Sequence, residues 1–291
     1  MSKSVSFIGL GKMGTAMVEK LLETGVGVTV FNRTIEKAQP LAARGATIAS
    51  SLRSAVKEAD IIFTSLLDDT ALSTVSSEIL AIKKPNLIHV STSTILPKTA
   101  TQLENLHRQS GNYYIAAPVL GVPDALREKQ AMTICAGDQE MMPLVISLVE
   151  AYSDSVMNLG KNAADASVFK ICMNYSLVSA IELISELYAF SEKSGLDTTV
   201  VQEALKHLYS HPSIHRYIDK IHDRNFDQVN FDMYGGNKDI NLFQQAFNDV
   251  GVIPDIANMV RGKFTEALAN GMGDKDWSAI GNIIRQRSGL D

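Results

Sequence analysis

The side chains best suited to acid–base chemistry in this sequence are Lys170 and Asn174, which lie in a strongly apolar run. A spacing of four places both on one face of a helix, within reach of the same ligand. Burying an ammonium among apolar side chains is costly, so this lysine needs a depressed pKa or a bound partner. Held in a dry pocket, it would donate a proton to a carbonyl oxygen as that carbonyl is reduced. The residues alone leave another interpretation open, in which Lys170 snorkels to the surface and Asn174 caps a local turn.

A glycine-rich turn supplies a place for a reducing cofactor. Gly9, Gly11 and Gly14 follow a short apolar strand and fit the G-x-G-x-x-G dinucleotide fingerprint. The N–H groups at the start of the following helix would face a pyrophosphate. We therefore predict a cofactor-binding segment made of Gly9, Leu10, Gly11, Lys12, Met13 and Gly14.

The end of the second predicted strand indicates which dinucleotide is bound. The acidic residue that takes the ribose hydroxyl in NAD-binding folds is replaced by Asn32, followed by Arg33 and Thr34. A guanidinium pairs well with a 2′-phosphate, which a carboxylate would repel. The pattern favours NADP over NAD, although Arg33 as an ordinary solvated residue at a strand end is the alternative.

Metal and disulfide chemistry have little support. His207, His211 and His215 are spaced by four, but Pro212 breaks the helix they would share and no carboxylate or cysteine joins them. We predict no metal site. Cys135 and Cys172 both lie in apolar runs, which predicts buried free thiols in a reducing compartment.

Strand-like and helix-like segments alternate from Val5 to Leu159, and no convincing strand follows. This predicts an α/β fold, with a Rossmann-type doubly wound sheet over residues 1–160 and an all-helical domain over 161–291. The helical domain is built on one helix of about thirty residues, roughly 45 Å long, over Ala163–Lys193. Residues 234–237 read as a flexible turn that feeds a helix from Lys238.

The predicted helix Ala163–Lys193 is apolar on nearly every side and must therefore be buried all round. A domain of about 130 residues would bury it better with a second subunit, so we predict a homodimer or homotetramer. Lys170, Glu182 and Glu186 interrupt the run, which argues against a membrane span. The net charge of −5 and the absence of a basic cluster argue against nucleic acid. No signal peptide is visible, so we expect a cytoplasmic protein.

Several runs together resemble the β-hydroxyacid dehydrogenase family, which includes 3-hydroxyisobutyrate dehydrogenase, is 6-phosphogluconate dehydrogenase-like, and contains glyoxylate and succinic semialdehyde reductases. The resemblance covers nearly the whole chain. It is carried by residues 9–14, 32–34, Ser93-Thr94-Ile95-Leu96-Pro97, Ala117-Pro118-Val119, the segment 160–174 and Lys238-Asp239.

The resemblance implies roles for particular residues. Lys170 would be the catalytic lysine and Asn174 its partner. Thr94 and Lys238 would contact the cofactor near the nicotinamide, and Leu66-Leu67 would line its adenosine side. It also implies a nucleotide domain followed by a helical domain, in interlocked dimers or tetramers.

The substrate loop departs from the family pattern. Where members that act on small hydroxy acids carry Asp-Ala-Pro-Val-Ser-Gly-Gly, this chain has Leu120, Gly121 and Val122 after Ala-Ala-Pro-Val. Leucine and valine make the expected substrate site more apolar. The loop resembles that of imine reductases, whose members often carry aspartate or tyrosine in place of Lys170. The chain thus combines a dehydrogenase lysine with an imine-reductase-like loop.

The sequence therefore predicts an NADP-dependent oxidoreductase that transfers hydride between the cofactor and a small aldehyde, ketone or hydroxy acid. Lys170 would be its general acid and base, and Leu120, Gly121, Val122 and Lys170 would meet the substrate. An imine reductase is the first alternative, favoured by Leu120 and Val122. A binding module that holds NADP without catalysis is the second.

Overall fold

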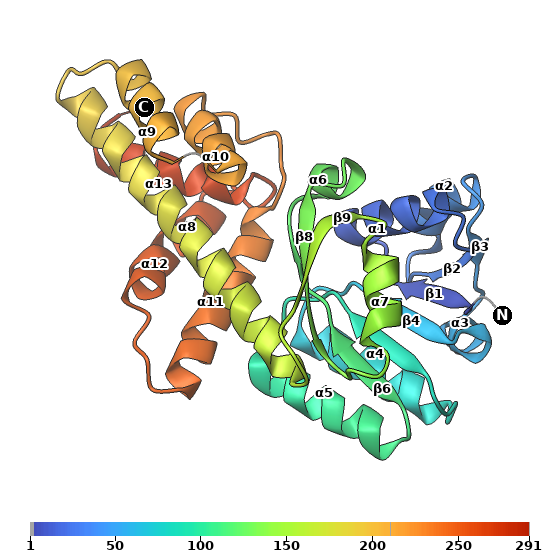
Figure 1. The fold of residues 1–291 in the computed structure, drawn as a ribbon. Helices are drawn as coiled ribbons and strands as arrows, with labels where there is room; N and C mark the ends of the chain where they lie inside the picture. Colours follow the sequence, from blue (N-terminus) through green and yellow to red (C-terminus); the bar gives the residue numbers. More distant parts are fainter. Residues whose placement is uncertain (1–2, 210, 291) are drawn as a thin grey trace. The chain divides into compact units, whose positions relative to one another are not determined.

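A computed structural model describes residues 3–209 and 211–290, and the chain divides into two compact units, residues 1–171 and 172–291. The break after Ile171 falls within the helix α8 (Ala163–Lys193), whose bounds agree with those expected from the sequence. Figure 1 shows strands and helices in the first unit and helices in the second, which confirms the predicted fold class.

The first unit is built on one sheet with the strand order β3-β2-β1-β4-β5-β6-β8-β7, and β9 pairs with β8. The pairings from β3 to β6 are parallel, and β8 runs antiparallel to β6 and β7. The strands are β1 (Val5–Ile8), β2 (Val28–Phe31), β3 (Thr47–Ile48), β4 (Ile61–Thr64), β5 (Ile88–Ser91), β6 (Tyr113–Ala116), β7 (Val119–Leu120), β8 (Ala131–Gly137) and β9 (Ser153–Asn158).

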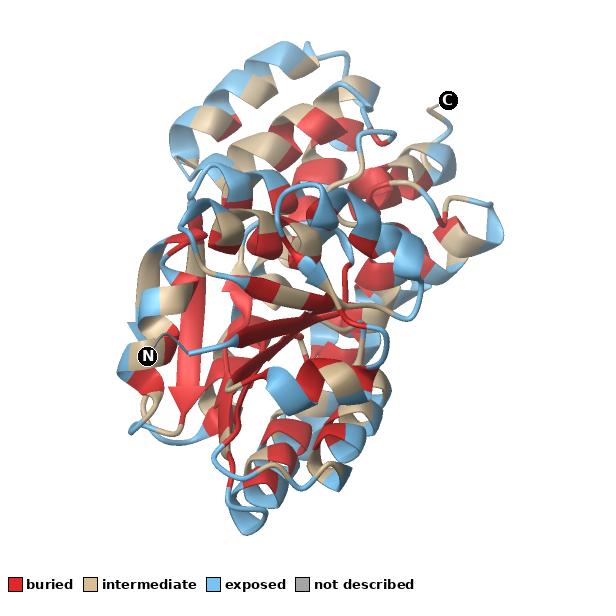
Figure 2. Ribbon diagram, turned by 90° about the vertical axis from the view of Figure 1, so that its right-hand side faces the viewer, coloured by how far each residue is buried: buried red, intermediate tan, exposed pale blue. Residues whose placement is uncertain are grey.

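Helices cover both faces of this sheet, so the residues of its central strands are buried on both faces. Every residue of β1, β4 and β5 is buried, as the red strands in Figure 2 show. The helical segments of the unit are α1 (Lys12–Glu23), the 3₁₀ turn η1 (Ile35–Ala38), α2 (Gln39–Ala42), α3 (Leu52–Glu58), α4 (Asp69–Ala81), α5 (Pro97–Gln109), α6 (Pro123–Arg127) and α7 (Met142–Val149).

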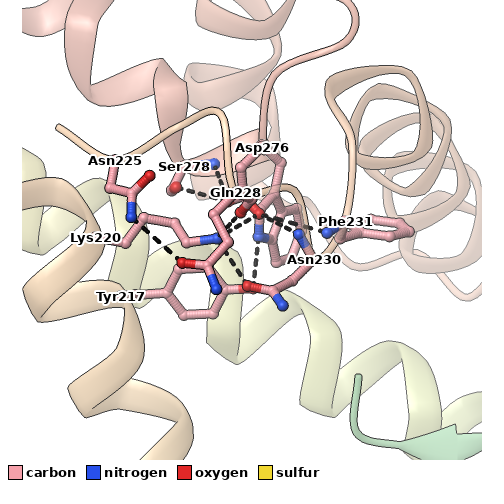
Figure 3. Close-up of polar contacts among 9 residues, drawn as sticks. Tyr217, Lys220, Asn225, Gln228, Asn230, Phe231, Asp276 and Ser278 are labelled. Carbon is pink, nitrogen blue, oxygen red and sulfur yellow. Dashed lines mark hydrogen bonds and ion pairs between the residues drawn. The ribbon is translucent and has the colours of Figure 1, made fainter. Parts of the chain in front are cut away.

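The second unit contains most of α8 and five further α-helices in its described part. These and one 3₁₀ turn are α9 (Thr198–Leu208), α10 (Pro212–His222), α11 (Met233–Asp249), α12 (Asp255–Ala269), η2 (Trp277–Ala279) and α13 (Ile280–Arg287). A buried ion pair between Lys220 of α10 and Asp276 holds the loop that precedes α11 (Figure 3). Lys220 Nζ lies 2.9 Å from Asp276 Oδ2 and 2.7 Å from Asn230 Oδ1, and it also donates to the carbonyl of Gln228. Three acceptors thus satisfy the three protons of this buried ammonium.

Two sequence predictions need correction. The segment 234–237 is the first part of α11 rather than a flexible turn, because Asp232 caps the helix through a 2.7 Å bond from Gly235 N. Cys172 is exposed, although Cys135 is buried as expected. Within the single chain, α8 leaves Val168, Leu183 and Phe190 exposed, so the burial predicted for this helix depends on a second subunit.

Candidate active site

The glycine turn between β1 and α1 has the shape that a pyrophosphate cradle requires. Gly9 has φ +96°, and a side chain there would meet the carbonyl oxygen of Ser65 at 2.3 Å. A Cβ on Gly14 would meet Gly9 O at 2.1 Å, so the third glycine lets α1 pack against the turn. At Gly11, which is exposed, a Cβ would meet nothing within 4 Å, so its backbone faces open space at the start of α1. These residues therefore fit a dinucleotide phosphate group.

The side chain of Asn32 ties the end of β2 to this turn. Its Oδ1 accepts a 3.0 Å bond from Leu10 N, and its Nδ2 donates 2.8 Å to Thr34 O. Both ends of the amide are thus occupied by the protein. Arg33 and Thr34 are exposed beside it, where they are available to a ligand.

Two further loops lie at the same carboxyl edge of the sheet as the glycine turn. The first follows β4 and carries Leu66, which is half-buried, and Leu67, which is exposed. The second follows β5 and carries Thr94, which is half-buried between Ser93 and Ile95. In parallel sheets with this strand order, ligands bind outside the carboxyl ends of the strands. The structure thus brings Leu66, Leu67 and Thr94 to the edge that carries the glycine turn.

Lys170 does not snorkel to the surface. Its side chain is buried, and its Nζ donates a 2.7 Å hydrogen bond to the main-chain oxygen of Val119. Val119 directly precedes Leu120, the first residue of the predicted substrate loop. The ammonium of Lys170 therefore lies beside that loop within the first unit. The expected partner of a buried lysine is therefore present, and it is a backbone carbonyl.

The substrate loop predicted from Leu120, Gly121 and Val122 is partly regular. Leu120 belongs to β7, is paired with Met132, and packs against an apolar cluster of the unit. Gly121 has φ +157°, and a Cβ there would meet Ala131 Cβ at 2.9 Å. Val122 is the N-cap residue of α6. Sequence reasoning missed both β7 and α6, which hold this loop on the first unit.

In the second unit Asn174 lies beside Lys238 through a residue that the sequence analysis did not single out. Asn174 Nδ2 donates 3.1 Å to Asp239 Oδ2, and Lys238 Nζ lies 2.6 Å from Asp239 Oδ1. The second contact is an ion pair without hydrogen-bond geometry. Asp239 is buried, and its bond to Nδ2 leaves Asn174 Oδ1 as the end of that amide that can accept a hydrogen bond from a ligand. The feature of the sequence that could have indicated this contact is the aspartate that directly follows Lys238.

Within residues 3–209 and 211–290, no three His, Cys, Asp or Glu side chains lie together as a metal site would require. His211 caps α10, accepting a 3.2 Å bond from Ser213 N, and His215 Nε2 lies 3.0 Å from Lys206 O. Two of the three evenly spaced histidines, His211 and His215, therefore have local structural contacts.

Two family models match this chain almost end to end. The NAD binding domain of 6-phosphogluconate dehydrogenase matches residues 4–160. A model described as NAD-binding of NADP-dependent 3-hydroxyisobutyrate dehydrogenase matches residues 164–284. These descriptions name both NAD and NADP, so they leave the choice between the two open.

Individual proteins are also similar to this chain over nearly its whole length. The chain is 34% identical over 284 residues to the uncharacterized oxidoreductase YfjR of Bacillus subtilis, covering 97% of this chain and 99% of that one. It is 27% identical to an NADPH-dependent reductive aminase of Aspergillus oryzae, with both chains fully covered. Its fold matches that of Mycobacterium tuberculosis 3-hydroxyisobutyrate dehydrogenase with L-serine, with a TM-score of 0.88, 23% identity and coverage of 98% and 100%.

Proposed function

Because this chain belongs to the 3-hydroxyisobutyrate dehydrogenase family of NAD(P)-dependent oxidoreductases, we propose that it reduces a small carbonyl compound with NADPH and Lys170 as the proton donor. The observation that carries the proposal is the buried ammonium of Lys170, held 2.7 Å from Val119 O. The carbonyl of Val119 accepts a hydrogen bond from Nζ and thereby fixes the position of the ammonium beside the substrate loop.

The residues of this chain would act in distinct ways. Gly9, Gly11 and Gly14 would admit the pyrophosphate, and Arg33 with Thr34 would bind a 2′-phosphate. A bound nicotinamide would supply or accept the hydride. Lys170 would hold a proton at Nζ and give it to the carbonyl oxygen, or take it back in the oxidative direction. Asn174, oriented by Asp239, would offer its Oδ1 to a substrate hydroxyl or to the lysine.

Imine reduction is the second candidate, and the apolar pair Leu120 and Val122 favours it. The similarity to an NADPH-dependent reductive aminase gives the same indication. A carbon–nitrogen substrate has less need of a carboxylate-binding loop than a hydroxy acid has. Proton donation to the substrate nitrogen would again fall to Lys170.

A substrate panel read by NADPH absorbance tests the proposal. We expect oxidation of NADPH with small semialdehydes or ketones, and slower or no oxidation with preformed cyclic imines. The reverse ranking would establish the imine reductase. NADPH binding by fluorescence without turnover on any compound would contradict both and favour a non-catalytic module.

A further inference from the structure

The segment after β4 lies between the glycine turn and the Thr94 loop. On one side, Gly9 comes so close to it that a Cβ would meet Ser65 O at 2.3 Å and Leu66 Cδ2 at 2.9 Å. On the other side lies the segment 92–96, which joins β5 to α5. Residues 65–69, together with the sheet beneath them, therefore connect the glycine turn to the Thr94 loop.

Two hydrogen bonds connect the segment after β4 to the segment 92–96. One lies before Thr94 in the sequence and the other after it. Leu66 N donates 2.9 Å to Ser93 Oγ, directly before Thr94. Leu96 N donates 3.0 Å to Asp69 Oδ1, two residues after it. The segment 92–96 has no regular structure, and Leu96 is the N-cap of α5 without a side-chain cap of its own.

These bonds are placed where they restrict motion. Thr92 is already fixed to β4, because its N and Oγ1 both donate to Thr64 O at 2.9 Å and 3.0 Å. Ile95 and Leu96 are buried, which holds their side chains but leaves the main chain to be satisfied by a polar partner. Asp69, the first residue of α4, supplies that partner (Figure 1 shows where α4 and α5 lie).

We propose that Asp69 and Ser93 are positioning residues that fix the Thr94 loop against the segment on which the glycine turn packs. They align the nicotinamide end of the cofactor site with its pyrophosphate end. The inference rests on the proposed function, since it assigns Thr94 to the nicotinamide. Each side chain accepts a bond from a main-chain N–H, Ser93 from Leu66 and Asp69 from Leu96, so both act through the backbone.

The adjacent Asp68 provides a matched control. It caps α4 by accepting a 2.8 Å bond from Ala71 N, and within the described residues it makes no hydrogen bond to residues 92–96. Asp68→Ala should lower the stability of the fold, because the helix loses its N-cap. Asp69→Ala removes the link to Leu96, and Asp69→Asn keeps an oxygen acceptor there.

The experiment combines hydrogen exchange without cofactor and turnover with NADPH. Asp69→Ala and Ser93→Ala should speed exchange in residues 93–96 by about fivefold, the equivalent of one hydrogen bond. They should lower kcat by about tenfold or more through misplacement, while changing the NADPH Kd much less. Asp69→Asn and Ser93→Thr should restore both readouts, and Asp68→Ala should alter neither per folded molecule.

The outcomes separate this inference from the proposed function. Wild-type exchange and turnover in Asp69→Ala and Ser93→Ala would overturn the inference alone. If Asp68→Ala and Asp69→Ala change exchange and turnover equally, the cause is a general loss of stability, and the inference is overturned as well. A wild-type protein that does not bind NADPH would overturn the proposed function, and with it the positioning role.

Discussion

We propose that recognition of the cofactor ribose falls to Arg33 and Thr34, because the Asn32 amide is already bonded to the protein. The Asn32 amide bonds Leu10 N and Thr34 O, so it stiffens the turn. Arg33 is exposed next to it and presents a guanidinium, which pairs with phosphate in a fork geometry. Discrimination between NADP and NAD should therefore depend on one side chain.

We expect Arg33→Ala to raise the Kd for NADPH by about tenfold to a hundredfold, the value of a charge-assisted hydrogen bond. The Kd for NADH should change little, because NADH lacks the 2′-phosphate. Fluorescence titration with both cofactors measures this, and Arg53→Ala, at an exposed position of α3, is the control. Equal weakening of both cofactors would contradict the role.

At this scale the sequence predicts residue types better than their partners. The apolar neighbours of Lys170 correctly indicate burial. Its acceptor is a main-chain oxygen 51 residues away in sequence, and main-chain atoms leave no mark on the pattern of side chains. The link from Asn174 to Asp239 crosses 65 residues and depends on tertiary packing for the same reason.

A chain of buried hydrogen bonds joins β4, β5 and α5 in one direction. His107 Nδ1 lies 2.8 Å from Leu103 O, which can only accept, so His107 donates there. When His107 is neutral, its Nε2 accepts from His89 Nδ1 at 2.9 Å, and His89 Nε2 accepts from Thr64 Oγ1 at 2.9 Å. This chain of bonds fits two neutral imidazoles. Burial lowers the pKa of His107, and burial with the neighbouring imidazole lowers the pKa of His89 further.

We expect the free energy of unfolding to fall as pH drops below about 6.5, the ordinary histidine pKa. Below that pH the unfolded chain binds protons that the folded chain excludes. The free energy of unfolding then falls by up to about 1.4 kcal/mol per pH unit for each histidine. Above it these groups contribute no slope. Urea unfolding between pH 5 and 8 measures the effect. The double variant His89→Gln/His107→Gln should flatten the profile, and the exposed His207→Gln should not; an unchanged slope in the double variant would refute the assignment.

Elements were predictable where apolar period and capping residues agree. The helix Ala163–Lys193 has the bounds that the sequence indicates. The two-residue strand β7 and the five-residue helix α6 were not expected, because segments so short carry no period. They are held by pairing with β8 and by packing of α6 against α1, which are tertiary effects.

At the scale of the whole molecule, α8 presents apolar side chains that this chain leaves exposed. Phe190 is 72% exposed, and Val168 and Leu183 are also exposed. By length and composition alone α8 would be long enough to cross a membrane. Its buried Glu182 pairs with Lys263 of α12, which is typical of a helix packed inside a protein. We propose that a second copy of the chain covers its exposed apolar residues.

Sedimentation velocity at micromolar concentration should therefore show a dimer or tetramer. The double variant Leu183→Asp/Phe190→Asp should shift it toward monomer, because an interface cannot bury unpaired carboxylates cheaply. Leu106→Asp, at an exposed apolar position of α5, is the control and should leave the assembly intact. A monomeric wild-type protein would contradict the prediction.

The central claim is that Lys170 delivers the proton, and single-turnover oxidation of bound NADPH by the best carbonyl substrate tests it most directly. Lys170→Ala should bind NADPH as the wild type does and lose at least about a hundredfold in the rate of oxidation. Lys193→Ala, exposed at the other end of α8, should retain both. A Lys170→Ala variant that oxidises NADPH at the wild-type rate would contradict the account.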